Sequence, residues 1–196
     1  GMVRSPVAGF PDVVAAAGRT DAYVVGPGLA DETRLGQAVG QAMAAGRPVV
    51  MDAEALPHVA PGPVVITPHE GEFARLGFSI APDRIAAVRA AAATLQVAVL
   101  LKGAVTVVAE PGGQVYVNLH SSPNLATAGS GDVLSGLLGG LLARHFVNRA
   151  PDLATMARLA ACAALIHGEA GRRAAFPATA VDIADEVRAA VAWAAG

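Results

Sequence analysis

Four short apolar runs constrain the fold of this chain more than any other feature. They read AYVVG, PVVMD, PVVIT and VAVLL, at residues 22–26, 48–52, 63–67 and 97–101. Each run is apolar almost throughout rather than alternating, which is typical of parallel strands buried on both faces. Helical stretches separate the runs. We therefore predict an α/β fold with a parallel sheet and right-handed crossover connections.

Helix start and stop signals support this prediction. Residues 31–46 open on the capping residue Asp31 and close on Gly46. Residues 82–95 open on Pro82, which the first turn of a helix tolerates because its missing N–H would have no partner there. The sequence thus predicts a helix in each of these two segments.

The pattern changes further along the chain. Residues 104–119 form two alternating runs around Pro111, Gly112 and Gly113, which indicates a β-hairpin. Helical patterns then cover 132–145, roughly 152–171, and 180–195. No repeat or linker interrupts the sequence. We expect one α/β domain with a mostly parallel central sheet, flanked by helices, and an antiparallel hairpin near one side.

Composition excludes several classes of function. Hydrophobic residues make up 54% of the chain and charged residues 15%, which is typical of a globular domain. The net charge is −2 without basic runs, so nucleic acid is not an expected partner. The apolar stretches are too short and glycine-rich to span a bilayer, and no signal peptide is recognisable at the N-terminus. A single cysteine cannot form an internal disulfide, so we expect a cytoplasmic protein.

Asp132 follows a loop of very small residues at 127–131 and stands at the start of a predicted helix. Open backbone N–H groups and the positive end of the helix dipole form an anion site there, most naturally for phosphate. This setting favours an ionised carboxylate, which can accept a proton from a hydroxyl group that attacks phosphorus. An ordinary helix N-cap explains the motif alone equally well.

Two more polar clusters follow predicted strands. Lys102 ends the fourth strand, where open α/β sheets bind ligands, and it suits a phosphate; a surface lysine is the simpler interpretation. His69, Glu70 and Glu72 follow the third strand and would lie on the same edge of the sheet. Phe73 stands where a zinc-binding H-E-x-x-H motif needs its second histidine, so zinc is not expected.

The remaining motifs and residues do not match the familiar nucleotide-binding or reactive sites. Residues 26–31 lack the G-x-G-x-x-G pattern because Asp31 stands at its last position, and no P-loop occurs, so phosphate would bind by another route. We expect Cys162 to be a small buried hydrophobe. His167, beside Gly168, is expected to be structural near a helix C-terminus.

Together these motifs resemble those of the ribokinase-like proteins, and among them the ADP/ATP-dependent NAD(P)H-hydrate dehydratases. Residues 124–143, NLATAGSGDVLSGLLGGLLA, resemble the superfamily signature in which a G-x-G-D loop carries the catalytic Asp. VVGPGLA, DAEAL, ITPHEGEFARL, LLKGAVTVV and HGEAG occur in the order typical of the family. The combination T-P-H-x-G-E, K-G-x-x-T and T-A-G-[ST]-G-D is far more specific than any single motif.

The resemblance implies a repair enzyme that restores NADH or NADPH from its C6 hydrate. ADP or ATP, with Mg²⁺, would phosphorylate the ring hydroxyl, and phosphate would then be eliminated. Asp132 matches the base that contacts the substrate, and His69 and Gly28 match other substrate contacts. Glu72 resembles an acidic residue that helps to organise Mg²⁺ through water. The nucleotide and phosphate positions match Lys102, Gly103, Ala104, Val105, Thr106, Gly129, Ser130 and Gly131.

This sequence departs from the family pattern at three points. Ala30 replaces the last glycine of G-P-G-x-G, and Ser130 replaces the commoner threonine. The family unit begins well before MVRSP, so we expect residues 1–196 to be a single, N-terminally truncated domain. The partners that the resemblance implies are further copies of the chain in a homo-oligomer and an epimerase domain or protein.

Two alternatives to the dehydratase stay open. A small-molecule kinase of the same superfamily would release a stable phosphorylated product, although His69 fits the dehydratases better than the sugar kinases. The second alternative is a truncated chain that binds nucleotide without turnover. The sequence does not decide between ADP and ATP, or between the hydrates of NADH and NADPH.

Overall fold

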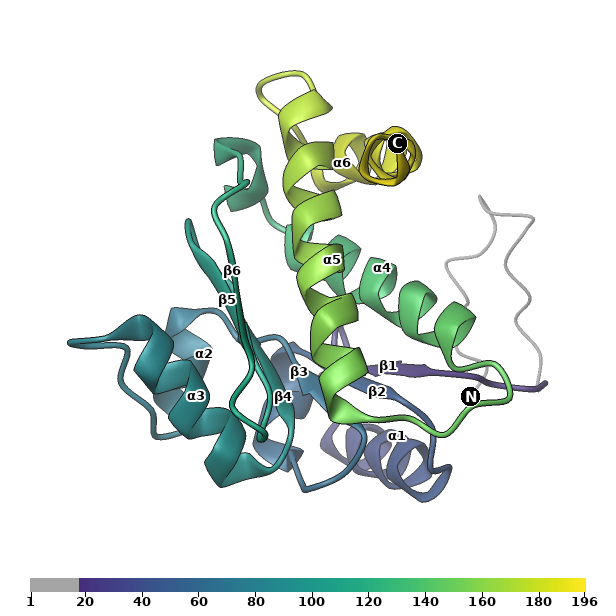
Figure 1. The fold of residues 1–196 in the computed structure, drawn as a ribbon. Coiled ribbons are helices and arrows are strands. Elements are labelled where there is room, and N and C mark those ends of the chain that lie inside the picture. The colour runs from purple at the N-terminus through teal and green to yellow at the C-terminus, as the bar shows by residue number, and fades with distance from the viewer. Residues whose placement is uncertain (1–17) are drawn as a thin grey trace.

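A computed structural model describes residues 18–196 as a six-stranded mixed sheet with helices on both faces (Figure 1). β1 to β4 are parallel, β5 and β6 continue the sheet antiparallel, and each strand pairs with the next. The predicted fold class is confirmed. The strands are β1 (Tyr23–Val25), β2 (Val49–Met51), β3 (Val64–Ile66), β4 (Ala98–Leu101), β5 (Thr106–Ala109) and β6 (Val115–Asn118). Residues 1–17, on which the signal-peptide expectation rests, lie outside the described residues.

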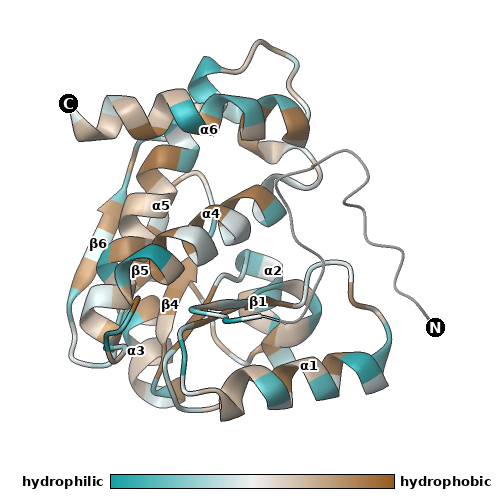
Figure 2. Ribbon diagram, turned by 90° about the vertical axis from the view of Figure 1, so that its right-hand side faces the viewer, coloured by the Kyte–Doolittle hydropathy of each residue, from teal (hydrophilic) through white to brown (hydrophobic). Residues whose placement is uncertain are grey.

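Successive side chains of each strand enter two different cores. Val49 and Met51 pack with α1 (Glu32–Ala44), α2 (Glu70–Arg75) and α3 (Arg84–Leu95) on one face of the sheet. Val50 and Val65 pack on the other face with α4 (Ser130–His145) and α5 (Leu153–Arg173). Because β2, β3 and β4 are buried at every position, these three strands need apolar residues throughout. Figure 2 shows hydrophilic and hydrophobic stretches alternating along α1, as expected of a helix with one buried side.

The last helix, α6 (Ala180–Ala195), forms an outer layer. Ile183 and Ala190 of α6 pack against Ile166 and Ala170 of α5, and both views show α6 lying across the end of that helix (Figures 1 and 2). Two short 3-10 segments, η2 (Ala53–His58) and η3 (Pro123–Ala126), complete the described elements. Between residues 18 and 196 no helix combines the length and the apolar character that crossing a bilayer requires.

The observed start of α1 agrees with the start predicted from the sequence, whereas the observed start of α3 differs from it. Asp31 caps α1 by accepting a hydrogen bond from the Arg34 backbone N–H, as predicted. Pro82, however, lies before α3 rather than in its first turn. The reason is that Asp83 caps this helix, since its carboxylate accepts from two backbone N–H groups and so fixes the start at Arg84.

Two expectations about α5 are wrong. Cys162 is exposed rather than buried. The helix also continues past Gly168 to Arg173, so His167 is not at a helix terminus but buried. Gly168 is required for a close approach instead: a Cβ there would lie 1.9 Å from the carbonyl oxygen of His120.

Candidate active site

The carboxyl ends of the parallel strands and the N-terminus of α4 meet at one edge of the sheet. Lys102 follows β4, His69 follows β3, and Asp52 follows β2. Two cavities open on either side of the loop that begins α4. Ligand sites in open α/β folds lie at this edge of the sheet, as the sequence led us to expect.

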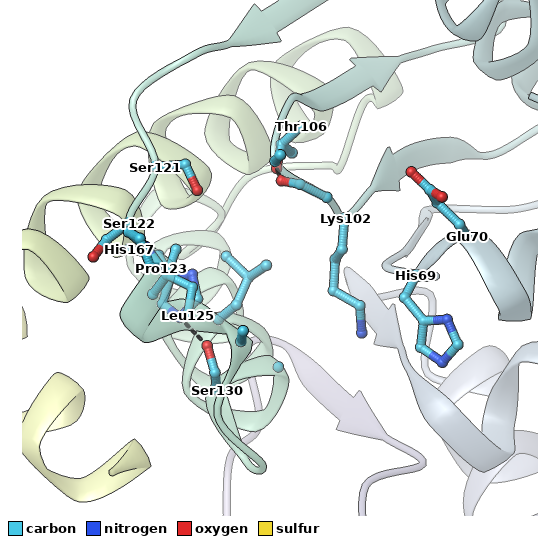
Figure 3. Close-up of a pocket in the computed structure, with 15 residues that line it drawn as sticks. His69, Glu70, Lys102, Thr106, Ser121, Ser122, Pro123, Leu125, Ser130 and His167 are labelled. Carbon is cyan, nitrogen blue, oxygen red and sulfur yellow. Dashed lines mark hydrogen bonds between the residues drawn. The ribbon is translucent and has the colours of Figure 1, made fainter. Parts of the chain in front are cut away.

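The larger cavity, of about 830 Å³, collects most of the predicted nucleotide positions. Its lining includes Lys102, Gly103, Ala104, Thr106, Ser130 and Gly131, but neither Val105 nor Gly129. Figure 3 shows Lys102 and His69 on one side and Ser130 and His167 on the other. One end is apolar, formed by Pro123, Leu125 and Ala126 of η3. A charged end and an apolar end suit a ligand with a phosphate and a base.

The smaller cavity, of about 440 Å³, holds Asp132 together with Gly28. It lies at the end of β1, and its wall includes Tyr23, Gln41 and Gly136. Asp132 is exposed. His69, the other predicted substrate contact, lines the larger cavity instead, so the structure separates it from Gly28.

Asp132 is not a helix cap. α4 begins at Ser130, and its N-cap residue is Gly129, which adopts a left-handed φ of 83° that favours glycine. Asp132 therefore stands inside the first turn, where its carboxylate faces the positive end of the helix dipole. The N-cap alternative is thus wrong, and the side chain is left for contact with a ligand.

The loop leaves fewer amides open than the sequence suggested. The N–H of Ser130 donates to the Thr127 carbonyl oxygen at 3.3 Å, and that of Asp132 donates to Gly129 at 3.1 Å. Within residues 18–196, the Gly131 N–H has no backbone acceptor. A Cβ on Gly131 would lie 3.3 Å from Lys102 Nζ, so this amide and this ammonium group are close neighbours. Together they form the positively polarised end of the larger cavity.

Lys102 is held by a buried carboxylate that the sequence analysis did not single out. Asp52, only 2% exposed, accepts from Lys102 Nζ and from Ser135 Oγ, both at 2.8 Å. Lys102 Nζ also lies 3.7 Å from Glu72 Oε2. Removing one partner of such a buried pair leaves an uncompensated charge, so the network holds the ammonium group in place. The signal available in the sequence was a lone Asp at the end of a buried strand.

His69 caps α2. Its Nδ1 accepts from the backbone N–H groups of Gly71 and Glu72, at 3.0 and 3.3 Å, while Glu72 Oε2 accepts from the His69 N–H at 2.7 Å. An accepting Nδ1 carries no proton, so in the neutral ring the proton is on Nε2. The donor at His69 Nε2 lies 3.5 Å from Glu72 Oε1, and Glu72 is thus tied both to this cap and to Lys102.

His167 lies under the loop on the opposite side. It is 6% exposed, and its Nε2 is 3.1 Å from Ser130 Oγ. Burial lowers the pKa of His167 from 6.5 to about 4; a hydrogen bond with the Ser130 backbone opposes this shift, and the charge of Lys102 adds to it. No local pattern reveals this contact, because the two residues are far apart in the sequence.

Comparisons with known proteins agree with this geometry. A family model described as NAD(P)H-hydrate dehydratase matches residues 4–190. The bifunctional NAD(P)H-hydrate repair enzyme Nnr of Mycobacterium tuberculosis is 46% identical over 165 residues, covering 73% of this chain and 35% of that protein. The Nnr enzyme of Synechocystis is 41% identical and covers 78% of this chain and 30% of its own length. The chain spans about a third of the length of these curated relatives.

Solved structures also resemble this fold. The ADP/ATP-dependent NAD(P)H-hydrate dehydratase from Bacillus subtilis, co-crystallised with ATP and Mg²⁺, is 30% identical with a TM-score of 0.73, over 89% of this chain and 65% of that one. A ribokinase-like superfamily protein from Enterococcus faecalis has a TM-score of 0.69 at 24% identity, over 86% of this chain and 62% of that one. The latter likeness concerns the fold alone, and it confirms the ribokinase-like architecture.

Proposed function

Because this chain belongs to the NAD(P)H-hydrate dehydratase family, we propose that it repairs hydrated nicotinamide cofactors as a nucleotide-dependent hydro-lyase. One observation carries the proposal: a single loop, Gly129–Asp132, separates a cavity with a fixed cation from a cavity with an exposed carboxylate. A phosphoryl donor on one side and a hydroxyl acceptor on the other would meet at this loop.

The nucleotide, ADP or ATP, occupies the larger cavity. Its phosphates lie toward Lys102 Nζ and the Gly131 amide, and its base toward Leu125 at the apolar end. The ammonium group is already oriented by Asp52, so binding costs little reorganisation. The crystallisation of the B. subtilis relative with ATP and Mg²⁺ supports this assignment.

The hydrated nicotinamide ring occupies the smaller cavity, near Gly28 and Asp132. The ring hydroxyl oxygen attacks the terminal phosphorus, the bond from phosphorus to the leaving nucleotide breaks, and the Asp132 carboxylate accepts the hydroxyl proton. In the second step the carbon–oxygen bond to phosphate breaks and the neighbouring ring carbon loses a proton, which restores the double bond. A general base of this kind contributes roughly 10²–10⁴-fold to a rate.

His69 contributes a donor rather than a base. Its proton is on Nε2 because the cap of α2 occupies Nδ1, so it can donate to an oxygen of a ligand that reaches the larger cavity. Its place on that side suggests that the substrate extends past the loop toward Lys102. The substrate contact that the family pattern predicts for His69 would therefore lie near the transferred phosphate.

Mg²⁺ fits this donor set when it is brought by the nucleotide. Among the described residues no three His, Cys, Asp or Glu side chains form a metal cluster. Mg²⁺ is usually held by one or two carboxylates together with phosphates and waters. Glu72, whose Oε2 lies 3.7 Å from Lys102 Nζ, would hold the ion through water. The ion would supply neutralisation of phosphate charge.

Several associations belong to the same proposal. We expect the chain to form a homo-oligomer, to act with an epimerase domain or protein that interconverts the hydrate epimers, and to work in the cytoplasm. The Nnr relatives are bifunctional enzymes, which supports a link to a second activity.

The test follows the near-ultraviolet absorbance of reduced nicotinamide, which the hydrate lacks. The chain, Mg²⁺ and hydrated NADH or NADPH are mixed with ADP or with ATP. A nucleotide-dependent rise that is absent in the Asp132→Asn variant is expected, and it also identifies the donor. Accumulation of a stable phosphorylated product would indicate a small-molecule kinase instead. Nucleotide binding without either product would indicate an inactive fragment.

A further inference from the structure

His167 is a buried ionisable residue for which the proposed mechanism has no use. It lies on α5, the long helix that crosses one face of the sheet, and its ring reaches the larger cavity beneath the start of α4 (Figures 1 and 3). The hydrogen bond between its Nε2 and Ser130 Oγ joins α5 to residues 129–132, which we call the anion loop. A histidine in this position either fills space or holds the loop.

Backbone hydrogen bonds tie residues 129–132 to one another, but the side chains beside Ser130 do not tie this segment to the rest of the protein. Ser130 stands between Gly129 and Gly131, and neither glycine has a side chain to fix the backbone. Ser130 is only 3% exposed, and its hydroxyl oxygen lies 3.1 Å from His167 Nε2 at the edge of the larger cavity. The only side chain of the Gly-Ser-Gly segment is therefore bonded to His167.

We propose that His167 is a positioning residue: its hydrogen bond to Ser130 fixes the backbone of the anion loop, and thereby the Gly131 amide, against a diphosphate group. This inference rests on the proposed function, since it names the part of the site that orients phosphate. His167 acts through Ser130 and not by proton transfer to a substrate.

The electrostatics of the site favour a neutral imidazole in this role. Lys102 already supplies a positive charge within reach of Gly131. Burial keeps the pKa of His167 near 4, so at neutral pH the ring forms its hydrogen bond without adding a second cation beneath the loop. Glutamine places an amide close to the position of Nε2 and can make the same bond, whereas leucine fills the space without it.

The experiment titrates the protein with inorganic pyrophosphate and with ADP, following the Gly131 amide by ¹H–¹⁵N NMR. The variants are Ser130→Ala, His167→Leu, their combination, and His167→Gln. Each of the first two should weaken binding about fivefold, the equivalent of one hydrogen bond. The double variant should lose no more than either single one, because both remove the same bond. His167→Gln should bind within about twofold of the native chain.

A matched control separates positioning from general loss of stability. Ile166→Val alters the neighbouring residue of α5, which packs toward α6, and it should leave pyrophosphate affinity unchanged while lowering the melting temperature. Adenosine, which has no phosphate, should bind all variants equally.

Three results would overturn the inference. These are unchanged affinity in His167→Leu, additive losses in the double variant, or the absence of a saturable Gly131 shift in the native chain. The absorbance assay is run on the same samples. If phosphate binding follows the expected pattern but no reduced nicotinamide forms, the proposed function fails and the role of His167 stands.

Discussion

The two cavities on either side of the anion loop differ in how their charged side chains are held. On the Lys102 side, charged groups are buried and paired: Asp52 is 2% exposed and holds both Lys102 and Ser135. On the Asp132 side, the carboxylate is exposed, and the wall is formed mainly by residues 23–29 at the end of β1. Substitutions on the first side should therefore affect folding and nucleotide binding together, whereas those on the second should affect turnover alone.

Asp132→Asn should produce the largest effect and the cleanest separation of the two sides. The amide cannot accept the hydroxyl proton, so kcat should fall by roughly 10²–10⁴-fold. Because Asp132 is exposed, stability and ADP affinity should change little. Turnover by absorbance and ADP binding by calorimetry provide the two readouts. Full turnover in this variant would show that the base lies elsewhere.

Asp52→Ala should lower the stability of the fold and the affinity for ADP, the two properties that Asp132→Asn should leave unchanged. It leaves the half-buried Lys102 with only the more distant Glu72 carboxylate as a counter-charge, which should lower the free energy of unfolding by about 1–3 kcal/mol. Urea unfolding measures this loss. The control is Asp52→Leu combined with Lys102→Met, an apolar replacement that should recover stability but not ADP binding. Recovery of both properties would mean that the pair has no part in the nucleotide site.

An effect of similar size on stability should come from the protonation of His167, which makes the stability of the fold depend on pH. The folded chain keeps this ring neutral down to a pKa of about 4, whereas the unfolded chain protonates it near 6.5. Between pH 6.5 and pH 4 the unfolded state therefore binds more protons than the folded state. The free energy of unfolding should fall by about 3 kcal/mol as the pH is lowered through this window. His167→Gln should remove this part of the pH dependence in urea unfolding. An identical slope in both proteins would refute the assignment.

Substitutions of His69 should have the smallest effects. They test whether the capping of α2 by this residue can be separated from its contact with the substrate. His69→Ala loses the cap of α2, at about 1 kcal/mol. His69→Asn keeps a good cap but removes the Nε2 donor, so stability should persist while KM for the hydrate rises. Thr179→Ala, which removes the comparable capping box of α6, is the control for capping alone and should leave KM unchanged. A KM that follows stability in all three variants would assign His69 to the cap only.

Much of the fold was predictable because its signals are local. The four apolar runs gave the parallel strands to within one residue at each end, since strands buried on both faces have no polar alternation. The turn at Pro111–Gly113 gave the hairpin. The start of α4 was less predictable, because Gly129 rather than Asp132 ends the loop, and only the backbone angles of Gly129 show this.

The candidate site was predictable in its motifs but not in its contacts. Lys102, His69 and Asp132 all follow strand ends or begin helices, so their place at one edge was implied by a parallel sheet. Asp52 and His167 were not singled out as functional, because a carboxylate ending a strand and a histidine within a helix are common features. Their partners come from distant parts of the chain.

The sequence by itself determined the order and type of the elements, the edge at which polar residues gather, and the family whose motifs they match. Only the tertiary structure decided that the site is divided into two cavities, that Asp52 fixes Lys102, that His69 carries its proton on Nε2, and that His167 bonds Ser130. The physical reason is distance along the chain. Local propensity and periodicity depend on neighbouring residues, whereas buried hydrogen bonds and ion pairs depend on which helices and strands the packed core brings together.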